Sequence, residues 1–227
     1  MDNICFIPTK NSSTRLKNKN IASYRNGNLI THTIEQAIES NIFNRIILSS
    51  NDINILKMTN EYGIESYYLE DTEKQIIGVT KKIIKKLDLP NSASLGILLV
   101  TGPLRLPEDI VEAYNLFIKN KRQYPVVSVK KNENPVQMAF KKDLCGHLKP
   151  IMPKEFYRST RKQDHYDTFY FNDAIIFDLI SKFKHPNRTL YGNNPIPYVM
   201  PWERSIGIDY QFQLDIVRCL GENNGEI

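Results

Sequence analysis

The sequence lacks the features that would place it in a membrane, in a secreted fold or in a small metal-bound fold. None of its apolar runs approaches the ~18 residues that cross a bilayer, since the run at 96–100 is followed by threonine and glycine. Its N-terminus has no basic flank or cleavage site of a signal peptide, so we expect a cytoplasmic protein with no membrane partner. The three cysteines, Cys5, Cys145 and Cys219, form no C-x-x-C pair and indicate neither a disulfide framework nor a zinc site.

Acidic residues are absent from one long stretch. No Asp or Glu occurs between Asn3 and Ile34, although the net charge of the whole chain is only +5. Five cations fall in that stretch: Lys10, Arg15, Lys17, Lys19 and Arg25. This asymmetry is the first indication of an anionic ligand.

The order of apolar and helical segments predicts an α/β fold. With 227 residues and 41% hydrophobic content, the chain is long enough for one compact domain over 1–227. Short apolar runs at 4–8, 45–50, 66–69 and 95–100 alternate with helical patterns, which favours a doubly wound, mostly parallel Rossmann-like sheet. After about residue 124 the pattern changes to strands at 125–130, 136–141 and 168–178 around a basic stretch. We expect a projecting element at about 125–166.

The loop after the first strand, 9–20, contains neither GxGxxG nor GxxxxGK[ST]. Dinucleotide binding of the usual type and a P-loop are therefore disfavoured. The loop offers Lys10, Ser13, Arg15 and Lys19, a set suited to a triphosphate. A solvated basic loop is the alternative interpretation.

Five motifs in order resemble the CMP–sialic acid synthetases, which activate nine-carbon 3-deoxy-2-keto sugar acids. Residues 7–21, IPTKNSSTRLKNKNI, resemble the pattern I-P-A-R-G-G-S-x-[RG]-[IL]-x-x-K-N-[IL]. Residues 100–105 (VTGPLR) resemble P-T-S-P-[LF]-R, and 161–164 (RKQD) resemble R-x-Q-D. Residues 172–175 (NDAI) resemble N-G-A-[IL], and 206–209 (IGID) resemble [IV]-D-I-D. Segments at 134–141, 158–164 and 197–201 look most like the pseudaminic acid branch.

The resemblance implies a nucleotide-diphospho-sugar transferase type of fold with a small lobe that forms a homodimer. It implies transfer of CMP from CTP to the 2-hydroxyl of a nonulosonic acid, of sialic, pseudaminic or legionaminic type, for surface glycan synthesis. Mg²⁺ is the expected cofactor, with Mn²⁺ as the alternative. By resemblance, Lys19 and Asp209 are catalytic and Asp209 binds the metal, CTP is held by Lys10, Ser13, Arg15, Lys19 and Asn20, and the sugar acid by Arg105, Arg161, Gln163 and Asn172.

Two departures from the family pattern bear on turnover. Gly207 stands where the first acid of D-I-D is expected, which leaves Asp209 as the remaining carboxylate of the motif. Where the family has an R-P pair after the third strand, this chain has the acidic segment 69–73 (LEDTE). An acidic segment close to a triphosphate is unfavourable unless it faces away or holds a cation.

The sequence is also compatible with several alternatives. Gly207 and the missing R-P pair favour a paralogue that binds a nucleotide without turnover. A GT-A-type glycosyltransferase would share the sheet but should carry D-x-D after a central strand, and 98–101 contains no acid. Arg105 could mark a plain strand-to-helix turn, Asn172 a strand irregularity, and Asp209 a helix N-cap. The lysines at 81, 82, 85 and 86 suggest a solvated helix face and no nucleic-acid partner.

Overall fold

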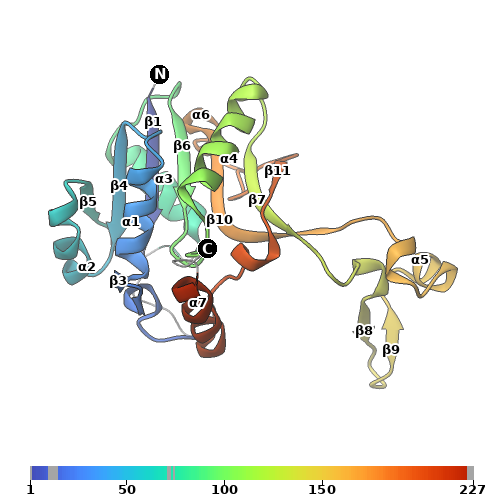
Figure 1. The fold of residues 1–227 in the computed structure, drawn as a ribbon. Coiled ribbons are helices and arrows are strands. Elements are labelled where there is room, and N and C mark those ends of the chain that lie inside the picture. Colours follow the sequence, from blue (N-terminus) through green and yellow to red (C-terminus); the bar gives the residue numbers. More distant parts are fainter. Residues whose placement is uncertain (1, 10–14, 71–72, 74, 224–227) are drawn as a thin grey trace.

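The computed structural model describes residues 2–9, 15–70, 73 and 75–223. In the described chain a seven-stranded sheet forms the centre of the fold (Figure 1). β10 pairs antiparallel with both neighbours, and the other pairings are parallel. The predicted doubly wound, mostly parallel sheet is confirmed. In spatial order the strands are β11 (Ile196–Val199), β7 (Val126–Lys131), β10 (Phe169–Leu179), β6 (Ser94–Leu98), β1 (Asn3–Pro8), β4 (Arg45–Ser50) and β5 (Glu65–Tyr68).

Helices cover both faces of this sheet. α1 (Leu29–Glu39) contacts α4 (Pro107–Lys119), and α3 (Ile76–Lys86) contacts α6 (Ile180–Phe183). The remaining helices are α2 (Ile53–Met58), α5 (Pro153–Arg158) and α7 (Gln211–Asn223). No helix in the described ranges has both the length and the apolar character that a bilayer span requires.

Two small antiparallel pairs and five short turns complete the described elements. The pairs are β2 (Ser23–Tyr24) with β3 (Gly27–Asn28), and β8 (Phe140–Lys142) with β9 (Leu148–Pro150). The 3-10 turns are η1 (Lys19–Ile21), η2 (Asn60–Tyr62), η3 (Val136–Met138), η4 (Lys162–Asp164) and η5 (Trp202–Arg204).

Alternation along the strands divides the core into two clusters. On β1, Cys5 and Ile7 pack into the cluster that includes α1 and α4, whereas Ile4 and Phe6 pack into the cluster that includes α3 and α6. Period-2 alternation places successive side chains on opposite faces, so a strand buried on both faces reads as a continuous apolar run. This is why the run at 4–8 could be recognised as a strand.

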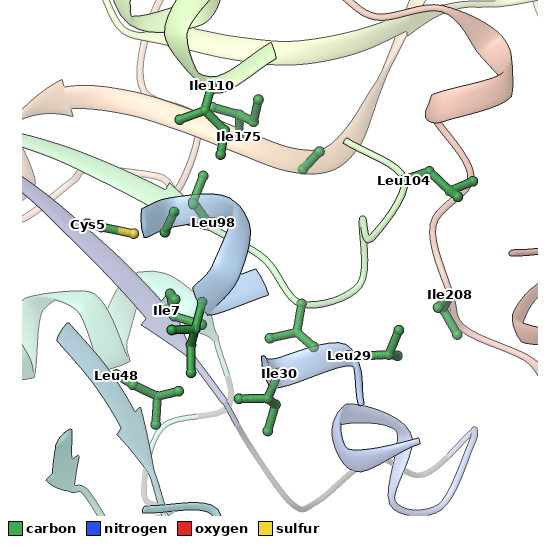
Figure 2. Close-up of a cluster of buried hydrophobic side chains, with 14 of the residues drawn as sticks. Cys5, Ile7, Leu29, Ile30, Leu48, Leu98, Leu104, Ile110, Ile175 and Ile208 are labelled. Carbon is green, nitrogen blue, oxygen red and sulfur yellow. The ribbon is translucent and has the colours of Figure 1, made fainter. Parts of the chain in front are cut away.

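The first cluster extends beyond the sheet into two connecting segments. Figure 2 shows Ile208, from the segment before α7, near Leu29 of α1, and Leu104, from the loop after β6, belongs to the same cluster. Ile208 has 0% and Leu104 3% of its surface exposed. Apolar packing therefore fixes the segment on either side of Ile208, including Gly207 and Asp209.

The segment between β7 and β10 departs from the prediction in one place. We expected a strand over 136–141, but residues 136–138 form η3 and the strand is confined to β8. Pro135 precedes the turn, and a proline cannot donate to a sheet ladder. β8, β9 and α5 lie to one side of the central sheet (Figure 1), and we call residues 136–165 the lobe.

The loop after β6 is held from inside by Arg105. Arg105 is the largest fully buried side chain, and its Nη1 donates to the carbonyls of Leu99 (2.7 Å), Gly102 (3.0 Å) and Ala174 (3.4 Å). Burial lowers the pKa of its guanidinium to about 10. A Cβ at Gly102 would lie 2.9 Å from that of Ala174, so only glycine allows this close approach.

Helix α1 holds the same loop from outside. Gln36 Nε2 donates to the carbonyls of Pro103 (3.2 Å) and Arg105, and His32 Nε2 lies 3.1 Å from Pro103 O. Burial, followed by the charges of Arg25 and Arg105, lowers the pKa of His32 to about 4. His32 is therefore neutral in the folded protein at pH 7.

Replacing Arg105 should reduce stability. Arg105→Met removes a side-chain donor from three buried carbonyls. Those of Leu99 and Ala174 keep a backbone donor, so the loss falls mainly on the Gly102 carbonyl, at about 1–3 kcal/mol, offset in part because a buried charge is removed. We expect the unfolding free energy to fall by roughly 2 kcal/mol in urea titrations. Arg161→Met, at an exposed position, is the matched control and should leave it unchanged. A wild-type midpoint for Arg105→Met would contradict this role.

His32 should make stability depend on pH. The pKa of histidine is 6.5 in the unfolded chain and about 4 in the folded protein, so between these values the unfolded state binds an extra proton. Stability should therefore rise with pH across this window, by up to about 3 kcal/mol. His32→Gln keeps a donor for the Pro103 carbonyl and removes the titration. Its stability curve, measured between pH 4.5 and 7, should be flatter; parallel curves would rule out this contribution.

Candidate functional site

The strand order reverses between β1 and β6. From β1 the chain proceeds to β4 and β5 on one side and then returns to β6 on the other. The carboxyl ends of adjacent parallel strands on either side of such a reversal leave a crevice where ligands bind. The loop after β1, the loop after β6 and the segment 205–209 meet here, as their contacts show.

Lys19 joins the first loop to the segment before α7. Its Nζ donates to Ile208 O at 2.6 Å and to Asp209 Oδ1 at 3.1 Å, and 12% of its side chain is exposed. Asn18, at φ 57°, precedes η1, a left-handed geometry that asparagine tolerates. Arg15 Nη2 lies 3.0 Å from the same Asp209 oxygen, with 56% of its side chain exposed. Two cations of the acid-free stretch therefore gather on Asp209.

Asn172 holds the other side of this segment. It lies where the register between β10 and β7 shifts, and 4% of its surface is exposed. Its Oδ1 accepts from Ser128 Oγ (2.5 Å), and its Nδ2 donates to Ser205 Oγ (3.1 Å). The backbone of the segment is fixed as well, because Ile208 N donates to Thr101 O at 3.0 Å.

A buried acid at the start of α4 fixes the residue that precedes segment 205–209. Asp109, 1% exposed, accepts from Arg204 Nη2 (2.6 Å) and Nε (3.1 Å) and from the Tyr198 hydroxyl (2.9 Å). It also accepts from Leu106 N at 2.7 Å, which caps the helix. Hydrogen bonding to Asp109 raises the pKa of Arg204, so this ion pair persists across the physiological range. Arg204 directly precedes Ser205.

An open polar cleft of about 180 Å³ lies beside these contacts. The sequence predicts two of its lining residues, Asn172 and Asp209, and Gly207 is the position of the absent acid. The prediction missed Lys130 and Asp173. The signal for Asp173 was present, because an acid stands where N-G-A has glycine. The cleft is lined by Thr101, Lys130, Phe171, Asn172, Asp173, Ser205, Gly207, Ile208, Asp209 and Gln213.

The other expected site residues are distributed unevenly. Arg15 and Lys19 reach Asp209, and Asn20 follows Lys19 in η1, half-buried. Lys10 and Ser13 lie outside the described residues. We expected Arg105 to contact the sugar acid, but 0% of it is exposed, so it has no surface to offer a ligand and holds the loop instead.

Arg161 and Gln163 do not line the cleft. Both are exposed and belong to the lobe. They lie against each other: with its amide oriented to satisfy both groups, Gln163 accepts from Arg161 Nε at 3.0 Å.

The structure shows the contacts of Asp209 and of the acidic segment 69–73. The carboxylate of Asp209 binds cations, and it is the Gln213 side chain that accepts from the backbone N–H groups of Asp209 (2.7 Å) and Tyr210 (2.9 Å) at the start of α7. Asp209 therefore is not the N-cap that the alternative interpretation required. In the acidic segment, Glu73 Oε1 pairs with Lys82 Nζ at 3.3 Å, so Glu73 holds a cation of α3.

Comparisons with known proteins agree with this geometry. The model of the family described as "Cytidylyltransferase" matches residues 4–168. The chain is 27% identical to a pseudaminic acid cytidylyltransferase of Campylobacter jejuni, over 100% of this chain and 99% of that protein. It is 24% identical to an N-acylneuraminate cytidylyltransferase of Escherichia coli, over 94% of this chain and 50% of that protein.

Solved structures show the same fold at low identity. A CMP:2-keto-3-deoxy-manno-octonic acid synthetase complexed with CTP superposes with a TM-score of 0.72 at 11% identity, covering 99% of this chain and 100% of that one. A 4-diphosphocytidyl-2C-methyl-D-erythritol synthase gives 0.64 at 9% identity, covering 96% and 98%. The family model spans most of the chain and the fold agrees, so this protein belongs to the cytidylyltransferase family.

Proposed function

We propose that the protein transfers CMP from CTP to the 2-hydroxyl of a nonulosonic acid and releases pyrophosphate. The observation that carries this proposal is the Lys19 ammonium, fixed between Ile208 O and Asp209 at the crevice between β1 and β6. The full-length similarity to a pseudaminic acid cytidylyltransferase supports the acceptor class. The reaction belongs in the cytoplasm, where CTP is available.

The chemistry requires charge neutralisation more than covalent catalysis. The 2-oxygen of the acid forms a bond to the α-phosphorus, and the bond from that phosphorus to the bridging oxygen breaks. Pyrophosphate leaves with the electron pair, and the proton of the hydroxyl passes to solvent. Positioned cations stabilise the charge that develops on the phosphate oxygens. Lys19 has three N–H donors, of which two contact Ile208 and Asp209; in this proposal the third binds the phosphates.

The surrounding residues complete the nucleotide site. Lys10, Ser13 and Arg15 are proposed to hold the triphosphate, and Asn20 the nucleoside. Mg²⁺, when bound, would neutralise phosphate charge, and Asp209 would hold it through the hard oxygen ligands that this ion prefers. Asn172 contributes by fixing Ser205 and the segment that follows.

The acceptor site draws on a second copy of the chain in this proposal. Arg161 and Gln163, expected to bind the sugar acid, lie in the lobe and not in the cleft. The lobe exposes large apolar side chains, among them Leu144 (107%), Tyr157 (76%) and Leu148 (69%). Exposed large apolar side chains on one small element favour association with a partner. We therefore propose a homodimer in which the lobe carries Arg161 to the partner's cleft.

Lys19→Ala should weaken CTP binding. Loss of one charge-assisted contact costs about 1.5–3 kcal/mol, or roughly 10–100-fold in dissociation constant. Calorimetry with CTP measures it, and pyrophosphate release should fall at least as much. The exposed Lys17 provides the control, since Lys17→Ala removes the same charge nearby. Equal effects of the two variants would show that only the net charge of the loop matters.

The dimer predicts complementation between two defective variants. Sedimentation at micromolar concentration should give the mass of a dimer. When Lys19→Ala and Arg161→Ala proteins are mixed, mixed dimers contain one cleft with a native Lys19 and a native Arg161 of the partner. About a quarter of wild-type activity should return, since half of the dimers are mixed and one of their two sites is complete. A monomeric mass, or no recovery on mixing, would contradict the shared site.

A further inference from the structure

The cleft contains a second carboxylate that the sequence motifs did not assign. Asp173, on β10, lines the same 180 Å³ cleft as Asp209, which lies before α7. The acid expected at 207 is absent, and Gly207 also lines this cleft. Two acidic residues from two different elements therefore line one small cleft, and Lys130 lines it as well.

Asp173 is held in a defined position. Its backbone has φ 54°, a left-handed conformation that favours glycine and that aspartate tolerates better than most residues. The Tyr191 hydroxyl donates to its Oδ1 at 2.5 Å, and the Tyr191 ring stacks on Phe171 with centroids 3.8 Å apart.

The two departures from the family pattern are complementary. The N-G-A pattern has glycine where this chain has Asp173, and the D-I-D pattern has aspartate where it has Gly207. The backbone at 173 keeps the left-handed geometry that suits a glycine. One carboxylate is lost and one is gained at the edge of a single cleft.

The donor set fits a divalent cation. Mg²⁺ takes hard oxygen ligands and is held in many sites by one or two carboxylates together with substrate phosphates. The cation contacts of Asp209 use Oδ1, and the Tyr191 contact of Asp173 also uses Oδ1. Coordination through the remaining oxygens is compatible with both sets of contacts.

We propose that Asp173 is a ligand of the divalent cation together with Asp209, and that it replaces the carboxylate missing at Gly207. The proposal deepens the proposed function, on which it rests, by completing the metal site. It also removes the main argument for a non-catalytic paralogue, since the site retains two carboxylates.

A purely structural role for Asp173 makes different predictions. If Asp173 only anchors Tyr191, Asp173→Asn should behave like wild type, because an amide oxygen still accepts from the phenol and asparagine also tolerates the left-handed backbone. Tyr191→Phe would then mimic the loss of Asp173. If Asp173 binds the cation, the charge is what matters and Tyr191→Phe should have a small effect.

The test measures binding of Mn²⁺ to the nucleotide-free protein by the decrease in the paramagnetic resonance signal of the free ion. Asp173→Asn and Asp173→Gly should weaken binding by about 10–100-fold. Adding Gly207→Asp to Asp173→Gly should restore it, because a Cβ at 207 would meet nothing closer than Thr101 O at 4.0 Å. Asp215→Asn, which removes a carboxylate of α7 that does not line the cleft, is the control and should bind as wild type does.

Three outcomes would overturn the proposal. These are wild-type protein that takes up no Mn²⁺, Asp173→Asn protein that binds it normally, and failure of Gly207→Asp to rescue Asp173→Gly. Thermal melting of each variant establishes that it is folded. The measurement contains no CTP and no sugar acid, so an absence of cytidylyl transfer would contradict the proposed function while leaving this result intact.

Discussion

The site depends on the contact of Lys19 with Ile208 and Asp209, which lie 189 and 190 positions further along the chain. It can form because Ile208 is buried in the same cluster as Leu29 and Leu104, so the carbonyl that receives the ammonium is fixed by apolar packing (Figure 2). Without that anchor, the acid-free loop would be a solvated basic segment. Burial of Ile208 thus gives Lys19 of the acid-free loop a fixed position in the site.

Buried hydrogen bonds and an ion pair hold the other segments around the cleft. Arg105 holds the loop after β6, Asp109 holds Arg204, and Asn172 holds Ser205. Hydrogen bonds between buried polar groups give a rigid frame. The exposed cation Arg15 is the adaptable part. This division suits a reaction in which positioning of a charged substrate supplies most of the rate.

The sequence predicted the sheet because its central strands are buried on both faces and read as apolar runs, as at 4–8 and 95–100. It could not predict that Arg105 is buried, because the carbonyls that accept from its guanidinium are brought together only by the fold. The strand expected over 136–141 was wrong where Pro135 starts a turn. The β2–β3 pair was missed because two-residue strands carry no periodicity. The sequence shows Asp173 as an acid in place of the glycine of its motif, but only the fold places it in the same cleft as Asp209.

The central claim is that this cleft joins CMP to a nonulosonic acid, and product analysis tests it most directly. The protein is incubated with CTP, Mg²⁺ and a panel of nonulosonic acids, and the products are separated and identified by mass spectrometry and phosphorus resonance. The account predicts, for at least one acid, a phosphodiester of CMP and that acid together with an equimolar amount of pyrophosphate. CTP that remains intact with every acid, or that is hydrolysed without forming a CMP conjugate, would contradict it.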